Sequence, residues 1–316
     1  MKNLLWALLV FVGALCASTR PSFAQAAEVR TVPLAVLNPA GRVHVGLTAQ
    51  DLRVKGINAE IRDVTFDAGP RRILLLLDMS GSMSEPTAGK VTKWDYAKEM
   101  AKGFLRATLP QNFVALDVFS DKEKQVVPFT HNFASISAAL DALPAKPEGR
   151  TAAGDALHAA LLDFGEAPAF GDSVIFISDG EFGPDPSHRS LFSLRADVAV
   201  RDVRVFLLLP SVSSVVETPE ELMPDMNTFD FISGTGGYSF APKVFPGDWP
   251  PSEIYRSDPG ERIIALADAV QGTYRVQLQL TQPLRKKRDL HLETVGSDGK
   301  SIHGLFLYYP RVLYPD

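Results

Sequence analysis

The sequence predicts an α/β protein, in which a doubly wound and mostly parallel sheet is flanked by β segments at both ends of the chain. Continuous apolar runs such as 73–77 and 174–177 are typical of strands that are buried on both faces of a parallel sheet. Segments with apolar residues at helical spacing lie between these runs. The two ends of the chain instead alternate apolar and polar residues, as half-buried strands do.

The amino-acid composition excludes several classes of protein and function. The chain has 316 residues, of which 46% are hydrophobic and 22% charged, and a formal net charge of −5. This balance is typical of a globular protein and argues against long disordered stretches. A mildly acidic chain lacks the clustered positive charge that non-specific nucleic-acid binding needs. The single cysteine excludes an intramolecular disulfide framework and a cysteine-rich zinc site.

Residues 1–24 are interpreted as a secretory signal peptide. Lys2 is followed by an apolar run over 4–17, and small residues allow cleavage after Ala24 or Ala26. An uncleaved anchor is disfavoured because a span needs about 20 apolar residues. We therefore expect an exported protein, periplasmic or extracellular, with no membrane span in the mature chain.

A lipoprotein is the second alternative for this leader, with Cys16 as the lipidated residue. The residue before Cys16 is Leu15, which is larger than the small residue expected there.

The segment 25–70 is predicted to be β-rich. Thr48 stands three residues before Asp51, which indicates a short capped helical turn. Because about forty residues make a small core, we expect this segment to pack on the next domain. The predicted strands are 29–37, one beginning at 43–45, and 59–66.

The segment 71–272 carries the predicted doubly wound domain. Its strands and helices alternate along the chain, as that architecture requires. The predicted strands are 73–77, 112–120, 125–129, 174–177 and 203–209, and the predicted helices are 94–108, 133–143, 152–164, 188–200 and 262–270.

The segment 273–316 returns to β structure. Residues 274–280 alternate strictly, 290–293 follow, and the turn signal at 298–299 precedes a strand within 304–309. We expect this segment and 25–70 to form one sheet from both ends of the chain.

Three oxygen-bearing side chains follow the first buried strand. Asp78, Ser80 and Ser82 stand at alternate positions in a tight loop. Such a loop leaves the carboxyl end of a central strand, where ligands bind in open α/β sheets. Oxygen-only ligand sets suit hard divalent cations such as Mg²⁺, Mn²⁺ or Ca²⁺.

Further oxygen donors are expected at the same edge. Asp179 follows the apolar strand 174–177, and Thr151 stands at a helix start with its hydroxyl available. Asp155 lies one turn after Thr151 on the same helix face, so it either supports a metal site by a hydrogen bond or faces solvent. Glu181 is another candidate for the rim, although a solvated acid is the simpler interpretation.

In this order and context, the residues resemble the metal-ion-dependent adhesion site of the von Willebrand factor A domain family. The family pattern is Asp-x-Ser-x-Ser, then Thr, then Asp-Gly, and here it is complete in Asp78, Ser80, Ser82, Thr151 and Asp179. The resemblance implies a Rossmann-like domain and a divalent cation, most simply Mg²⁺, held through the three hydroxyls. It also implies that the two aspartates act largely through water, and that a partner protein supplies an Asp or Glu to the ion.

The flanking segments are similar to those of exported bacterial proteins described as VWFA-related proteins of Acidobacteria. The similarity is carried by residues 32–36, 41–42 and 46–52 and by the tail 274–309. It implies a short β module before the A domain and a β tail after it.

Partner binding, not catalysis, is the function that the sequence favours. An aspartyl phosphatase needs a second Asp where Ser80 stands, and the Gly-x-Ser-x-Gly elbow of serine hydrolases is absent. The alternative is a structural scaffold of an envelope assembly in which an ion only staples the loops. The hydroxyls could also be mere turn and cap residues, leaving no metal site.

Two surface features are left open by the sequence. The basic cluster 285–288 is most simply a solvated turn, with binding of an anionic surface as the alternative. The proline-rich loop 245–251 is either a contact surface or a rigid linker.

Overall fold

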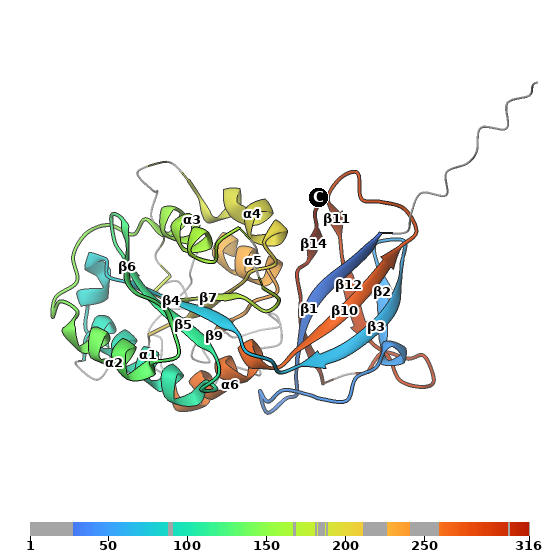
Figure 1. Ribbon diagram of the computed structural model, residues 1–316, viewed down its shortest axis with the longest axis horizontal. Coiled ribbons are helices and arrows are strands. Elements are labelled where there is room, and N and C mark those ends of the chain that lie inside the picture. The colour runs from blue at the N-terminus through green and yellow to red at the C-terminus, as the bar shows by residue number, and fades with distance from the viewer. Residues whose placement is uncertain are drawn as a thin grey trace, which may run out of the picture.

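The computed structural model shows two lobes, one built from helices packed on a sheet and one built from strands (Figure 1). The predicted signal peptide, Glu181 and the loop 245–251 lie outside the described residues. The structure describes residues 28–87, 91–166, 169–180, 182, 187, 189–210, 226–240, 259–302 and 304–315.

A six-stranded sheet forms the centre of the first lobe, in the order β6-β5-β4-β7-β8-β9. All neighbouring strands are parallel except β5 and β6, which are antiparallel. The predicted doubly wound, mostly parallel sheet is therefore confirmed. Its strands are β4 (Arg72–Asp78), β5 (Phe113–Phe119), β6 (Glu123–Thr130), β7 (Ser173–Ile177), β8 (Arg204–Leu208) and β9 (Ser239–Phe240).

Helices cover both faces of this sheet. On one face, α1, α2 and α6 enclose a core that includes the buried Trp94 and Phe104. On the other face, α3, α4 and α5 enclose a core that includes Phe176, Val205 and Leu207. The helices are α1 (Lys93–Ala107), α2 (Phe133–Ala142), α3 (Ala153–Asp163), α4 (Arg195–Val200), α5 (Met226–Gly234) and α6 (Pro259–Gln271).

The second lobe combines strands from both ends of the chain, as predicted. Its main sheet has the order β13-β1-β10-β3, with β10 paired antiparallel to both β1 and β3. Two smaller pairs, β12-β2 and β11-β14, complete it. The strands are β1 (Val29–Leu37), β2 (Leu52–Lys55), β3 (Ala59–Asp67), β10 (Thr273–Leu280), β11 (Arg288–Asp289), β12 (His291–Thr294), β13 (Phe306–Tyr308) and β14 (Val312–Leu313).

The structure confirms one predicted turn and shortens one predicted strand and one predicted helix. The capped turn is present, because Ala49–Asp51 forms a 3-10 helix whose cap Thr48 exchanges hydrogen bonds with Asp51. The strand expected to begin at 43–45 is reduced to a single bridge between Leu37 and Val43. The helix expected over 188–200 begins as a 3-10 helix at Leu191–Leu194 and becomes α-helical only in α4.

A charged and aromatic cluster joins the two lobes where the chain passes from β3 to β4. Asp67 accepts a hydrogen bond from Arg275 Nε at 2.6 Å, and its backbone carbonyl accepts one from Arg71 at 2.5 Å. The Arg275 guanidinium also lies 3.8 Å from the ring centroid of Phe170. Because Phe170 precedes β7, this cluster ties the strand lobe to the edge of the central sheet opposite the loop after Asp78.

Candidate functional site

Three segments meet at the carboxyl edge of the central sheet. The loop after β4 is held to β5 by a hydrogen bond from Met79 N to the carbonyl of Phe119 (2.7 Å). It is held to the segment before α3 by a bond from Gly81 N to the carbonyl of Gly149 (3.0 Å). The backbone therefore places the Asp78 loop beside the segment that carries Thr151.

Asp78 is the buried acid of this edge. Its side chain is fully buried, its Oδ1 accepts a hydrogen bond from Ser80 N at 2.8 Å, and its Oδ2 accepts one from Ser178 Oγ at 2.7 Å. Burial raises the pKa of Asp78 to about 6, against the lowering effect of the bonds from Ser178 and Ser80, and the charge of Asp179 raises it further. Because both carboxylate oxygens of Asp78 already accept hydrogen bonds, this residue is suited to contact a cation indirectly, through a water molecule.

The hydroxyls of Ser80 and Ser82 point to the same place, since their oxygens lie 3.2 Å apart. Ser80 occupies the N-cap position of the 3-10 helix Gly81–Ser84, but its side chain makes no capping hydrogen bond. Thr151 is not a cap either, because the N-cap of α3 is Ala152. The structure therefore does not assign these hydroxyls the capping role that the sequence left open.

Asp179 is almost buried and carries an ion pair that the sequence analysis missed. Its Oδ2 lies 2.9 Å from Nζ of Lys93, which also contacts Glu85 Oε2 at 2.8 Å. Burial lowers the pKa of Lys93, but the hydrogen bonds to Glu85 and Asp179 and the charges of these two acids outweigh burial, so the pKa is raised. The signal was available: Lys93 is the first residue of α1, where the helix dipole favours anions, so a lysine there indicates a local acidic partner.

Asp155 lies on the first turn of α3 and accepts hydrogen bonds from Arg189 Nη1, at 2.9 Å, and from the Ser187 hydroxyl. It thereby anchors the chain that follows β7. Its role in support of a metal site stays a prediction.

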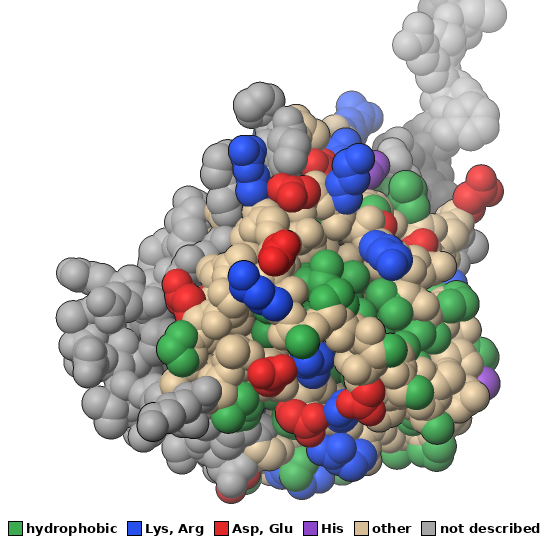
Figure 2. Space-filling view, turned by 90° about the vertical axis from the view of Figure 1, so that its left-hand side faces the viewer, with side chains coloured by type: hydrophobic (Ala, Val, Ile, Leu, Met, Phe, Trp, Pro, Cys, Tyr) green, Lys and Arg blue, Asp and Glu red, His purple; other side chains and the backbone are tan. Residues whose placement is uncertain are grey.

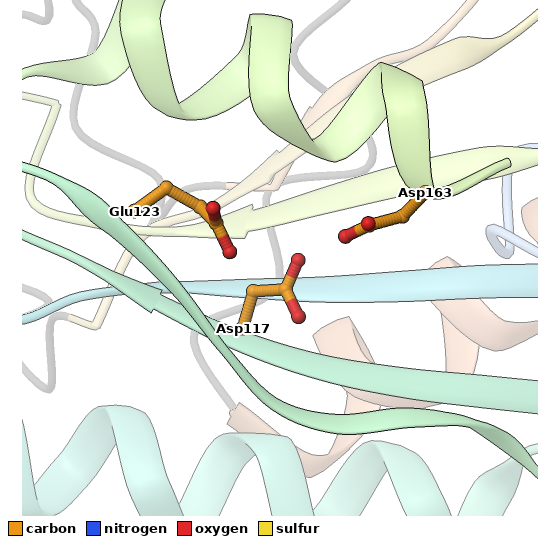
Figure 3. A group of neighbouring side chains, drawn as sticks. All are labelled: Asp117, Glu123 and Asp163. Atoms are coloured by element: carbon orange, nitrogen blue, oxygen red, sulfur yellow. The ribbon is translucent and has the colours of Figure 1, made fainter. Parts of the chain in front are cut away.

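A second acidic group, also missed from the sequence, lies under α3. One carboxylate oxygen from each of Asp117, Glu123 and Asp163 lies within 4.8 Å of the other two, and Figure 3 shows the three side chains pointing toward one another. The signal was Asp117 itself, a charged residue within the apolar strand β5.

Figure 2 shows the face around the edge strand β6, where acidic and basic side chains are interspersed rather than gathered by sign. In the part of the chain that the structure describes, no helix is long and apolar enough to cross a membrane. The basic cluster 285–288 is exposed, and its last residue, Arg288, is the first residue of β11.

Comparison with known families identifies the central segment. Residues 73–181 match the family model of the von Willebrand factor type A domain. The matched segment begins in β4 and ends just beyond Asp179. The central segment is therefore similar to a domain of this type, and the α/β fold that the resemblance implied is confirmed. No curated protein sequence matches the chain.

Several solved structures are similar to parts of this chain. The conserved hypothetical protein BatB from Bacteroides thetaiotaomicron is 21% identical, with a TM-score of 0.38, over 44% of this chain and 66% of its own. An aerotolerance-related membrane protein from Bacteroides fragilis is 14% identical, with a TM-score of 0.46, over 64% of this chain and 98% of its own. The D319A mutant of the PilB minor pilin from Streptococcus sanguinis is 14% identical, with a TM-score of 0.40, over 54% of this chain and 57% of its own.

Proposed function

We propose that this protein binds a partner protein through a divalent cation held at the carboxyl edge of the central sheet. The observation that carries the proposal is the pair of Ser80 and Ser82 hydroxyls, 3.2 Å apart, beside the buried carboxyl of Asp78. Hydroxyl and carboxylate oxygens are the donors that Mg²⁺, Mn²⁺ and Ca²⁺ prefer. We assign direct ligation to Ser80, Ser82 and Thr151, with Asp78 and Asp179 acting through water.

The chemistry of this donor set favours an external carboxylate. When bound, the cation would supply an electrophilic position that a partner's Asp or Glu can occupy. Neutral hydroxyls leave most of the positive charge uncompensated, and the nearest acids are already engaged, Asp78 by Ser178 and Asp179 by Lys93. The residues of this chain therefore hold the ion without saturating its demand for anionic ligands.

The proposal also covers where the protein acts and that it is a binding module, not an enzyme. We propose that the chain is exported, to the periplasm or beyond the cell, where Mg²⁺ or Ca²⁺ can fill the site. The von Willebrand factor type A match supports a binding module rather than an enzyme.

Metal binding is tested first on the mature chain. Isothermal titration with Mn²⁺ should give binding in the wild-type protein that is lost in Ser80→Ala/Ser82→Ala. Ser135→Ala is the matched control, because the Ser135 hydroxyl on α2 donates a local hydrogen bond to the carbonyl of Asn132, the N-cap residue of that helix.

Partner binding is tested next with immobilised protein and an envelope extract, in Mg²⁺ and in EDTA. We expect partners whose retention needs Mg²⁺, is lost in the double variant and is competed by free glutamate. Retention that is equal in EDTA would favour the structural scaffold instead.

A further inference from the structure

Asp117 carries a carboxylate that is buried in the apolar core of the central domain without a hydrogen-bond donor among the described residues. Its side chain is fully buried on the face of β5 that packs against α3, between the apolar Ala115 and Phe119. Neither carboxylate oxygen has a hydrogen-bond partner in the described structure. Because a buried carboxylate is costly unless it is paired or coordinates a metal, this residue requires an explanation.

Two further carboxylates converge on Asp117 from separate elements. Glu123 is the first residue of β6, and Asp163 is the last residue of α3. Oxygens of the three groups lie within 4.8 Å of one another, and in Figure 3 the fully buried Asp117 is aimed at the other two. One oxygen of Glu123 is also buried without a partner. Since Glu123 and Asp163 are half-buried, the group remains within reach of solvent.

The charges of this group are uncompensated within the described part of the chain. No lysine or arginine there forms an ion pair with any of the three acids. Burial, together with the neighbouring charge of Asp163, raises the pKa of both Asp117 and Glu123. A cation placed among the three oxygens would remove this repulsion and satisfy the unpaired atoms.

We propose that Asp117, Glu123 and Asp163 form a second divalent-cation site, selective for Ca²⁺ and separate from the site at Asp78. Ca²⁺ binds oxygens at about 2.3–2.6 Å, so ligands on opposite sides of the ion lie up to about 5.2 Å apart. The three oxygens lie within 4.8 Å of one another, which is inside that span. Mg²⁺, at about 2.0–2.1 Å, allows at most about 4.2 Å and demands a stricter geometry.

The position of the triad gives the ion a structural role. It connects the end of α3 to the β5–β6 hairpin. The turn of that hairpin also holds the start of α3, because Ser120 O accepts a hydrogen bond from Ala152 N at 2.9 Å. With Ca²⁺ at the triad, the β5–β6 hairpin would therefore hold both ends of α3, the end through the ion and the start through Ser120.

The test uses Tb³⁺ luminescence and Ca²⁺ titration of the full mature chain after removal of metals. The background is Ser80→Ala/Ser82→Ala, which disables the site at Asp78 and so separates this proposal from the proposed function. We expect this double variant to retain one Tb³⁺ site from which Ca²⁺ displaces Tb³⁺ more effectively than Mg²⁺ does, and to melt at a higher temperature in Ca²⁺ than in EDTA.

Three conservative variants, Asp117→Asn, Glu123→Gln and Asp163→Asn, are then added one at a time. Each should weaken Tb³⁺ binding at least about tenfold, since even the loss of an indirect supporting group typically costs that much. Asp141→Asn, which removes an exposed acid on α2, is the matched control and should leave binding unchanged. Folding of each variant is checked by its melting transition in EDTA. Binding of unaltered strength in all three variants, or a double variant that binds no Tb³⁺, would overturn the proposal.

Discussion

The ammonium of Lys93 lies 2.9 Å from the carboxylate of Asp179 and bridges it to Glu85. The first residue of α1 thus contributes a fixed positive charge to the edge of the sheet where we place a metal cation. A metal cation bound there would compete with Lys93 for the carboxylate of Asp179.

Removal of this charge should tighten metal binding. We expect Lys93→Met to raise the affinity for Mn²⁺ about tenfold, or about 1.4 kcal/mol, because one like charge is removed at a short distance. Titration calorimetry measures the change. Lys102→Met is the control and should have no effect on metal binding, because Lys102 lies further along the same helix and pairs with Glu99 and Asp141 instead. Weaker binding in Lys93→Met would show that Lys93 orders the site rather than opposes the ion.

Metal should stabilise the folded chain, and Asp78 should be required. At a concentration 100 times the dissociation constant, Mg²⁺ should add about 2.7 kcal/mol to the free energy of unfolding. Thermal unfolding with EDTA, Mg²⁺, Mn²⁺ or Ca²⁺ measures this as a shift in melting temperature. Asp78→Ala should abolish the Mg²⁺ effect, because it removes the acid that orients Ser80. A shift of equal size in this variant would exclude Asp78 from the site.

Deletion of 273–316 should unfold the strand lobe. β10 is the shared neighbour of β1 and β3, and β13, the other neighbour of β1, also lies in the deleted segment, so both strands lose their sheet partners. Hydrogen exchange should become fast across β1 and β3 in the truncated chain, while β4 and β7 stay protected. Protection of β1 at the level of the full chain would contradict the observed pairing.

Stability at acid pH should depend on Asp67. Burial raises the pKa of Asp67, but the bonds from Gly69 N and Arg275 outweigh it and hold this pKa below 3.8. A lowered pKa in the folded state means that the contribution of Asp67 is present above about pH 4 and is lost as the pH falls through the folded value.

Asp67→Asn should therefore lower the free energy of unfolding at pH 7 by about 1 kcal/mol. The difference from wild type should shrink as the pH falls below about 4, which urea unfolding at several pH values measures. Asp63→Asn, an exposed change on the same strand, is the control. A difference that is independent of pH would mean that the carboxylate charge does not matter.

The sequence predicts the strands and helices that have long apolar patterns. It does not predict the elements and contacts that depend on residues far apart in the chain. β4 and α3 follow from continuous or periodic apolar residues. β11 pairs with β14 through only two residues each, too few to show a period. The candidate loop at Asp78 is visible in the sequence because its three donors stand at alternate positions within five residues. The Lys93–Asp179 ion pair and the acidic triad join residues far apart in the chain, so they become apparent only in three dimensions.

The insertion of the central domain between β3 and β10 has a mechanical consequence. β1 is hydrogen-bonded directly to β10 and β13, so strands from the two ends of the chain are clamped to each other. Tension applied across the strand lobe would pass through these ladders and bypass the central sheet. The geometry of the Asp78 loop would then be insulated from pulling forces until the strand lobe itself ruptured.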